Sequence, residues 1–133
     1  MAVLQSLTPN LNVESIEACL PFWCETLGFQ KIMEVPQGDA LGFVMLQRDG
    51  IDLMLQTCSS MDDDMPKLAE DARKGATFLY LKVDDLDSFE AALDESTIEV
   101  PKRTTFYGAT EITVRSPGGH LVTLAQFAEE SAE

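Results

Sequence analysis

The stretch LNVESI at residues 11–16 recurs as LKVDDL at residues 81–86, an offset of 81 − 11 = 70 residues. Each copy is typical of a strand that runs into a helix. The far ends of the copies also correspond, because GIDLMLQ at residues 50–56 aligns with GHLVTLA at residues 119–125, an offset of 119 − 50 = 69. Two offsets this similar predict one folding unit used twice, with almost no net insertion. We expect the working site of such a duplicated unit where its halves face each other.

The first copy is predicted to fold as a strand, a helix and three further strands. Residues 3–13 alternate as in a strand, and Ser15 is a plausible N-cap for the helix. Pro21 interrupts that helix, because a proline inside a helix costs about 3 kcal/mol. The helix is therefore either kinked or made of two short turns with Pro21 at the start of the second. The remaining strands are expected, with hairpin turns between them, at Phe29–Val35, Leu41–Gln47 and Ile51–Thr57.

The second copy repeats this order after a polar joining segment. Residues 58–76 join the copies and are expected to contain a short helix around residues 66–73. In the second copy, Asp84 or Asp85 is expected to cap the helix. Its strands are expected at residues 77–83, Ile98–Arg103, Thr110–Arg115 and His120–Phe127.

Together these elements predict an α+β protein made of two βαβββ modules. Each module carries a helix on one face of its sheet only, so the other face needs cover. We expect the two curved mixed sheets to surround a shared concave cleft, a natural place for a ligand. A single domain, residues 1–133, would then consist of module 1 (about 3–57), a linker (58–76), module 2 (about 77–127) and a tail (128–133).

The charge and composition argue against several classes of function. The net charge of −14, from 23 acidic against 9 basic residues, opposes nucleic-acid binding and would favour a cationic ligand. No apolar run approaches the roughly 20 residues needed to cross a bilayer, and the start, MAVLQSLTPN, lacks the features of a signal peptide. The three cysteines, without CxxC spacing, are typical of reduced thiols. We therefore expect a cytoplasmic protein with no membrane or nucleic-acid partner.

Two stretches resemble the vicinal oxygen chelate superfamily, which includes glyoxalase I, extradiol dioxygenases and bleomycin resistance proteins. The first is FW at residues 22–23 followed by LGF at residues 27–29. The second, YGATEITVRSPGGHLVTLAQ at residues 107–126, resembles the family's YG…E…V..DP.GH pattern, with Ser116 and Gly118 where Asp is common. The resemblance covers essentially the whole chain and implies the same two-module fold.

Members of this family that use a metal hold it with four side chains, usually His, Gln or Glu. In this sequence the four corresponding positions hold one phenylalanine, one methionine and two threonines. A phenylalanine side chain has no ligand atom, the methionine sulfur suits only soft metals, and two threonine hydroxyls would not hold a divalent ion. We therefore predict no metal and no cofactor, which argues against chemistry that uses the ion as a Lewis acid. The single histidine, His120, is expected at the surface or in a second layer rather than as a ligand. By spacing, the resemblance places the four metal positions at Thr8, Met54, Phe78 and Thr123.

The predicted ligand-binding surface combines aromatic, methionine, amide and hydroxyl side chains, which suit a medium-sized organic molecule. Alternatively, the apolar members merely fill the space that a ligand would occupy. Glu111 is the candidate catalytic residue and could act as a general base if burial raised its pKa. We expect it instead to pair with Lys82 or Arg115. The predicted ligand-binding residues are Thr8, Asn10, Met54, Gln56, Phe78, Tyr80, Lys82, Tyr107, Glu111 and Thr123.

These observations favour a metal-free small-molecule binding protein that resembles the bleomycin resistance branch and sequesters its ligand. Proteins of that branch work as homodimers with acidic clefts, so the resemblance implies a homodimer and a cationic or aromatic ligand. One alternative is a lyase or dioxygenase with atypical metal ligands. Others are an enzyme that uses Glu111 as a base without a metal, and a regulatory or partner-binding domain.

Overall fold

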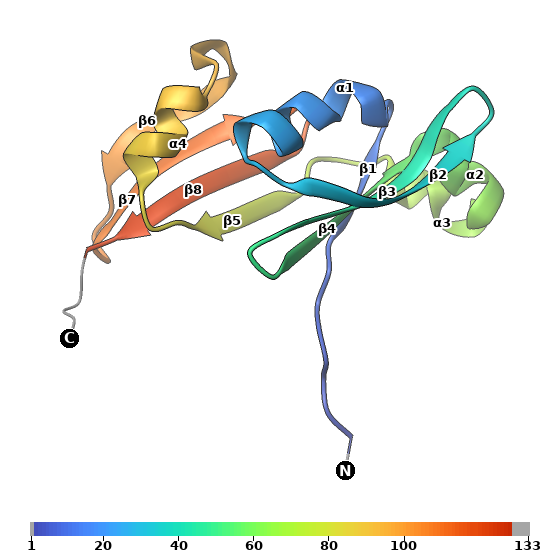
Figure 1. Cartoon of the computed structure of the whole chain (residues 1–133), viewed down its shortest axis with the longest axis horizontal. Helices are drawn as coiled ribbons and strands as arrows, with labels where there is room; N and C mark the ends of the chain where they lie inside the picture. Colours follow the sequence, from blue (N-terminus) through green and yellow to red (C-terminus); the bar gives the residue numbers. More distant parts are fainter. Residues whose placement is uncertain (1, 129–133) are drawn as a thin grey trace. The chain divides into compact units, whose positions relative to one another are not determined.

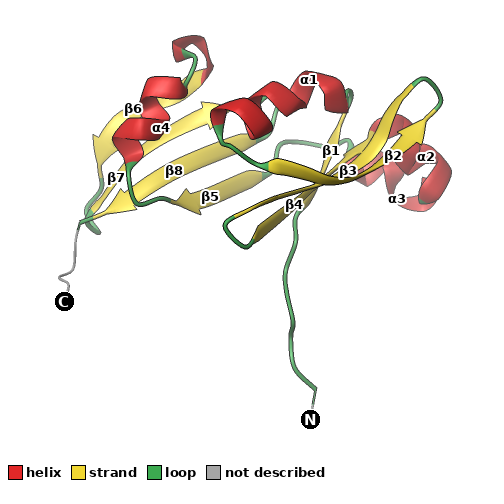
Figure 2. Cartoon of the chain, in the orientation of Figure 1, coloured by secondary structure: helices red, strands yellow, loops and turns green. Residues whose placement is uncertain are grey.

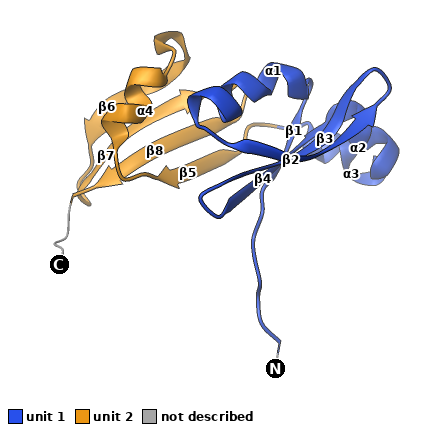
Figure 3. Cartoon of the chain, in the orientation of Figure 1, with its two compact units in different colours: residues 1–74 blue, residues 75–133 orange. Residues whose placement is uncertain are grey.

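A computed structural model describes residues 2–128 of the chain. The chain divides into two compact units, residues 1–74 (unit 1) and residues 75–133 (unit 2), which Figure 3 colours separately. The boundary lies inside the segment that was expected to join the two copies. The predicted tail beyond residue 128 lies outside the described residues.

Unit 1 contains a four-stranded mixed sheet and four helical segments (Figures 1 and 2). Its elements are β1 (Asn10–Val13), α1 (Ile16–Leu20), a π-helical segment (Pro21–Thr26), β2 (Gln30–Gln37), β3 (Ala40–Arg48), β4 (Ile51–Thr57), α2 (Cys58–Asp64) and α3 (Pro66–Ala72). The strand order is β1-β4-β3-β2, and β1 runs parallel to β4 while the other neighbours are antiparallel.

Local sequence signals determine where the first helix begins and ends. The Ser15 hydroxyl accepts a hydrogen bond from the backbone N–H of Ala18 at 3.2 Å, as expected of an N-cap. Pro21 is the first residue of the π-helical segment, where its missing N–H does little harm, so the helix consists of two short parts. Gly28 then ends it with φ 78°, a left-handed conformation that favours glycine.

The core of unit 1 lies between α1, the π-helical segment and one face of the sheet. Alternate side chains of β1, β3 and β4 point to this face, as the period of two in a strand requires. Ile16 and Trp23 cover them from the helical side. The buried strand residues are Leu11, Val13, Val44, Leu46, Leu53 and Leu55.

Unit 2 repeats the arrangement. Its elements are β5 (Phe78–Lys82), α4 (Leu86–Ala92), a 3₁₀ turn (Glu95–Thr97), β6 (Ile98–Thr104), β7 (Ala109–Arg115) and β8 (Leu121–Phe127). The strand order is β5-β8-β7-β6, with β5 parallel to β8. Asp85 caps α4 by accepting from the backbone N–H of Ser88 at 3.3 Å, and Gln126 holds its start by accepting from the backbone N–H of Leu86 at 2.7 Å. The prediction of an α+β protein with two βαβββ modules is therefore confirmed.

The first strand is shorter than predicted. It begins at Asn10 rather than at residue 3, and residues 2–9 have no regular structure. The bond from the Met54 N–H to the Pro9 carbonyl at 2.9 Å is the last before the chain leaves the sheet. Pro9 has no N–H to continue the ladder, and Leu7 before it is 96% exposed.

The joining segment carries more helix than predicted. Two helices, α2 and α3, occupy residues 58–72 where one short helix was expected around residues 66–73. The Thr57 hydroxyl accepts from the backbone N–H of Ser60 at 3.0 Å, so the last residue of β4 also caps α2. None of the helices in residues 2–128 is long and apolar enough to cross a membrane.

His120 is buried. Of the two positions expected for it, the second layer is therefore correct and the surface is wrong. The residue is 5% exposed, and its Nδ1 accepts a hydrogen bond from the backbone N–H of Thr77 at 3.0 Å. This bond fixes the turn before β8 to the start of β5. The single-domain organisation and the cleft shared by the two modules stay predictions.

Candidate ligand-binding site

The sheet of unit 1 has a second face, opposite α1, and three of its strands contribute one row of side chains to it. Gln56 on β4 lies opposite Phe43 on β3, and Phe43 lies opposite Val35 on β2. Gln56 is 5% exposed although it points away from the apolar core. Because α2 follows β4 directly, its side chains reach over the end of this row. We call the surface formed by Val35, Phe43 and Gln56 the pocket face.

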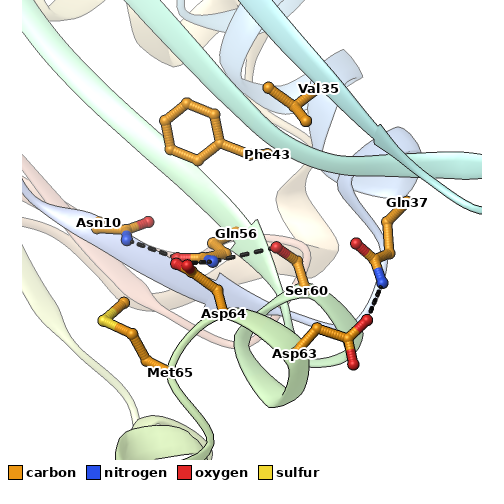
Figure 4. A pocket seen from close by; sticks show the side chains of 9 residues that line it. All are labelled: Asn10, Val35, Gln37, Phe43, Gln56, Ser60, Asp63, Asp64 and Met65. Atoms are coloured by element: carbon orange, nitrogen blue, oxygen red, sulfur yellow. Dashed lines mark hydrogen bonds between the residues drawn. The ribbon is translucent and has the colours of Figure 1, made fainter.

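A pocket of about 460 Å³ opens on the pocket face (Figure 4). Val35 and Phe43 form an apolar wall on one side, and Gln56, Ser60, Asp63 and Asp64 lie across from them, with Met65 beside these polar residues. Its volume lies within the range typical of small-molecule sites, and an apolar wall with a few polar groups is the usual composition of such sites. The residues that line it are Asn10, Val35, Gln37, Phe43, Gln56, Ser60, Asp63, Asp64 and Met65.

Gln56 connects three of the pocket residues. Its Oε1 accepts a hydrogen bond from Asn10 Nδ2 at 3.0 Å, while its Nε2 donates to Ser60 Oγ at 3.1 Å and to Asp64 Oδ2 at 3.4 Å. Both ends of the amide are therefore engaged, which fixes its orientation. The network holds β1, β4 and α2 together at the base of the pocket (Figure 4).

Two carboxylates give the pocket its negative charge. Asp63 and Asp64 are exposed residues of the last turn of α2, and Asp63 Oδ2 accepts from Gln37 Nε2 at 2.6 Å. Carboxylates at the C-terminal end of a helix lie beside its partly negative carbonyl groups, which reinforces the negative potential. With Phe43 lining the same pocket, the site can attract a positively charged group by Coulomb and cation–π interactions.

The predicted site residues of unit 2 form a different kind of cluster, centred on Glu111. This carboxylate is 3% exposed. Its Oε2 accepts from the Tyr80 hydroxyl at 2.5 Å and from the Tyr107 hydroxyl at 2.6 Å, and its Oε1 accepts from Arg103 Nη2 at 3.4 Å. The structure therefore brings three of the predicted ligand-binding residues, Tyr80, Tyr107 and Glu111, into contact with one another.

The environment of Glu111 favours the ionised carboxylate. Burial raises the pKa of the Glu111 carboxyl group. Interactions with the two tyrosine hydroxyls and Arg103 together lower this pKa by more than burial raises it, so the pKa lies below its ordinary value. The same contact raises the pKa of Tyr80 well above its ordinary value, because the neighbouring carboxylate accepts its proton in a hydrogen bond. A carboxylate with a lowered pKa is a weak base, which disfavours Glu111 as the general base of an enzyme.

The predicted partners of Glu111 were wrong. Arg103, at the facing position of β6, pairs with it instead of Lys82 or Arg115. Lys82 Nζ lies 4.9 Å from the centroid of the Phe127 ring, and Arg115 Nε donates to Glu99 Oε2 at 2.9 Å. The sequence does not show which basic residue of β6 is in register with Glu111, because register shifts interrupt the β6–β7 pairing.

The pocket and the Glu111 cluster occupy equivalent positions of the duplicated unit. Gln56 and Ala125 correspond through the offset of 69 residues, since 125 − 56 = 69. Phe43 faces Gln56 in unit 1, and Glu111 faces Ala125 in unit 2. The same face of the same fold therefore carries an open pocket in one unit and a filled polar cluster in the other.

The four positions where the family resemblance places metal ligands do not suit a divalent ion. The Thr123 and Thr113 hydroxyls are hydrogen-bonded to each other at 2.7 Å, and Phe78, 73% exposed, has no donor atom. Met54 is half-buried beside the pocket row, and Thr8 precedes β1. Within residues 2–128, no group of three His, Cys, Asp or Glu side chains is placed to hold a metal ion.

Of the ten predicted ligand-binding residues, the pocket contains only Asn10 and Gln56. Alternation along β3 places Phe43 on this face, whereas Val35 could not be found in this way because the bulge at Ile32 reverses the alternation along β2. Asp63 and Asp64 belong to α2, a helix that was not expected from the sequence. The seven pocket residues that the sequence did not predict are Val35, Gln37, Phe43, Ser60, Asp63, Asp64 and Met65.

Solved structures of similar fold come from several bacteria. A glyoxalase/bleomycin resistance protein/dioxygenase from Nocardioides is 17% identical, with 98% of this chain and 89% of that chain covered and a TM-score of 0.73. TnmS3, an antibiotic binding protein from Streptomyces sp. CB03234, is 23% identical, with 96% and 99% covered and a TM-score of 0.68. The bleomycin-binding protein of Streptomyces verticillus, solved with copper(II)-bleomycin, is 24% identical, with 97% and 100% covered and a TM-score of 0.61.

These similarities show a shared fold. Among curated proteins, none matches the sequence. The profile of one protein family matches residues 4–124, which include the first βαβββ module, the pocket residues and the second module as far as the middle of β8. With nearly its whole length matched, the chain belongs to the glyoxalase/bleomycin resistance protein/dioxygenase superfamily.

Proposed function

We propose that this protein is a small-molecule binding protein whose pocket in unit 1 takes, without the help of a metal ion, an organic cation with an aromatic or apolar body. The observation that carries the proposal is the pocket itself, in which an apolar wall faces two carboxylates across about 460 Å³. In this arrangement Asp63 and Asp64 attract the positive group, and Phe43 contacts the apolar body.

Three further observations support the proposal. The net charge of −14 concentrates cations near the protein at low ionic strength. Asn10 and Gln56 form hydrogen bonds within the protein, so the base of the pocket is ordered before a ligand arrives. Two structural neighbours are described as an antibiotic binding protein and a bleomycin-binding protein, so this fold accommodates such ligands elsewhere.

Calorimetry at low salt with matched ligands tests the proposal. The panel contains cationic glycopeptides, an aromatic amine, and the neutral and carboxylate analogues of that amine. The cations are expected to bind, the neutral analogue more weakly and the carboxylate not at all. Raising the salt concentration should weaken binding of the cations, because exposed carboxylates are screened. If none of the panel binds, or if the charge of the ligand makes no difference, the proposal is wrong.

The variant Asp64→Asn is expected to weaken cation binding at least about tenfold, because a hydrogen bond to a charged group contributes about 1.5–3 kcal/mol and about 1.4 kcal/mol is a factor of ten. The measurement is the dissociation constant of the aromatic amine. The matched control is Asp71→Asn, which removes the same charge from α3, where Asp71 pairs with exposed Lys74 outside the pocket. Equal losses in both variants would mean that net charge attracts the ligand and the pocket does not.

The roles of the other predicted ligand-binding residues stay predictions, as does the homodimer. Light scattering of the purified protein gives its mass in solution, with and without the ligand that calorimetry identifies. A mass close to 14.6 kDa in both states would contradict the homodimer.

A further inference from the structure

A row of methionines crosses three neighbouring strands of unit 1. Met33 on β2 lies opposite Met45 on β3, and Met45 lies opposite Met54 on β4. At the next strand the row ends with Asn10, which lies opposite Met54 and lines the pocket. Three of the chain's six methionines are thus in one cross-strand register, beside the row that forms the pocket face.

An irregularity in β2 brings Met33 into this row. Lys31 pairs with Leu46, and the next pair is Met33 with Met45, so Ile32 is an extra residue. If the pairing were regular, Ile32 would lie opposite Met45 and Met33 opposite Val44, whose side chain is fully buried in the core. A bulge of this kind redirects a side chain to the other face of the sheet.

The geometry suits one ion held by several sulfur atoms. Side chains directly opposite each other in neighbouring strands have Cβ atoms about 4.5–5.5 Å apart. Methionine has three rotatable bonds and a polarisable sulfur, so three neighbouring side chains can bring their sulfurs to a common point above the central strand. Met33 is 51% exposed and the other two are half-buried, so an ion can reach the row from solvent.

Thioether sulfur selects soft metal ions, of which Cu(I) is the commonest in cells, and it is a poor ligand for hard divalent ions. We propose that Met33, Met45 and Met54 bind one Cu(I) ion through their sulfur atoms. The proposal does not depend on the pocket ligand, because none of the three sulfurs belongs to a residue that lines the pocket. The strongly negative net charge adds a general attraction for the cation.

The test is an anaerobic Cu(I) titration of the full chain against a chromophoric Cu(I) chelator. Cys24 is half-buried and could bind Cu(I) by itself, so the titration uses a Cys24→Ser background. One equivalent is expected to bind. Met45→Leu, which removes the central sulfur at similar volume, should weaken binding at least tenfold, and Met33→Leu should weaken it as well. The control Met61→Leu changes a buried methionine of α2 outside the row and should bind as the parent does.

A second measurement locates the ion without relying on mutants. In protein labelled at the methionine methyl carbons, Cu(I) should shift the methyl signals of Met33, Met45 and Met54 and leave that of Met61 in place. Unchanged methyl signals, or a Met45→Leu variant that is folded and binds like its parent, would overturn the proposal. Equal binding by all variants would assign the metal to the remaining cysteine thiols instead.

Discussion

Replacing Trp23 by alanine should lower the free energy of unfolding by about 3–5 kcal/mol, the range for removing a buried large aromatic side chain. Trp23 is 2% exposed. Its ring meets Phe22 at 5.1 Å and Phe29 at 5.5 Å between centroids, both edge to face, so the change removes two aromatic contacts as well as buried area. Domains of this size are stable by about 5–15 kcal/mol, so the loss is a large part of the total.

Urea unfolding followed by circular dichroism measures this change, since the variant has lost its only tryptophan as a fluorescent probe. The control is Phe106→Ala, because Phe106 is 98% exposed and its removal should change stability by less than about 0.5 kcal/mol. Similar losses in the two variants would contradict the core that the structure places around α1. Since Trp23 belongs to unit 1, a separate second transition in the urea curve would report on unit 2.

The fold was predictable because its signals are local. The N-cap at Ser15, the proline at the start of the π-helical segment and the turn before β4 each lie within a few residues of the feature they determine. The bounds of β4, Ile51–Thr57, were predicted without error. The start of the first strand was predicted wrongly. A strand ends where its partner strand ends, and alternation alone cannot show that residues 3–9 have no partner strand.

The site was less predictable because it depends on contacts between distant residues. Asn10 and Gln56 were found, since alternation from a buried neighbour determines their face. The contribution of Asp63 and Asp64 requires that α2 fold back over the sheet, which no local pattern indicates. Val35 reaches the pocket face only after the bulge at Ile32, and an inserted residue reverses every face predicted beyond it.

Glu111→Gln should lower the free energy of unfolding at pH 7 by about 1.5–3 kcal/mol, the contribution of hydrogen bonds to a charged group. The carboxylate accepts from Tyr80, Tyr107 and Arg103, whereas a neutral amide offers one acceptor oxygen and no charge. The matched control is Glu99→Gln on the neighbouring strand β6, which breaks only an exposed pair with Arg115 and should cost less than about 1 kcal/mol.

The difference between the parent and Glu111→Gln should depend on pH in a defined direction. Because folding lowers the pKa of Glu111, its contribution is complete above the ordinary value of 4.5 and is lost as the pH falls through the lower pKa of the folded state. The stabilities of parent and variant should therefore converge in acid. At the alkaline end, folding raises the pKa of Tyr80, so the parent should lose stability as tyrosine ionises in the unfolded chain.

The same variant separates a structural Glu111 from a catalytic one. A carboxylate that acts mainly as a base would leave folding unchanged when replaced by glutamine and would abolish only turnover. Hydrogen bonds from two phenols and an arginine predict the reverse, a pH-dependent loss of stability that Tyr80→Phe should partly reproduce, with a non-additive double variant. If Glu111→Gln is as stable as the parent from pH 3 to pH 8, the cluster contributes nothing to folding, and this prediction is wrong. The alternative hypothesis, in which Glu111 acts as a general base, would then be favoured.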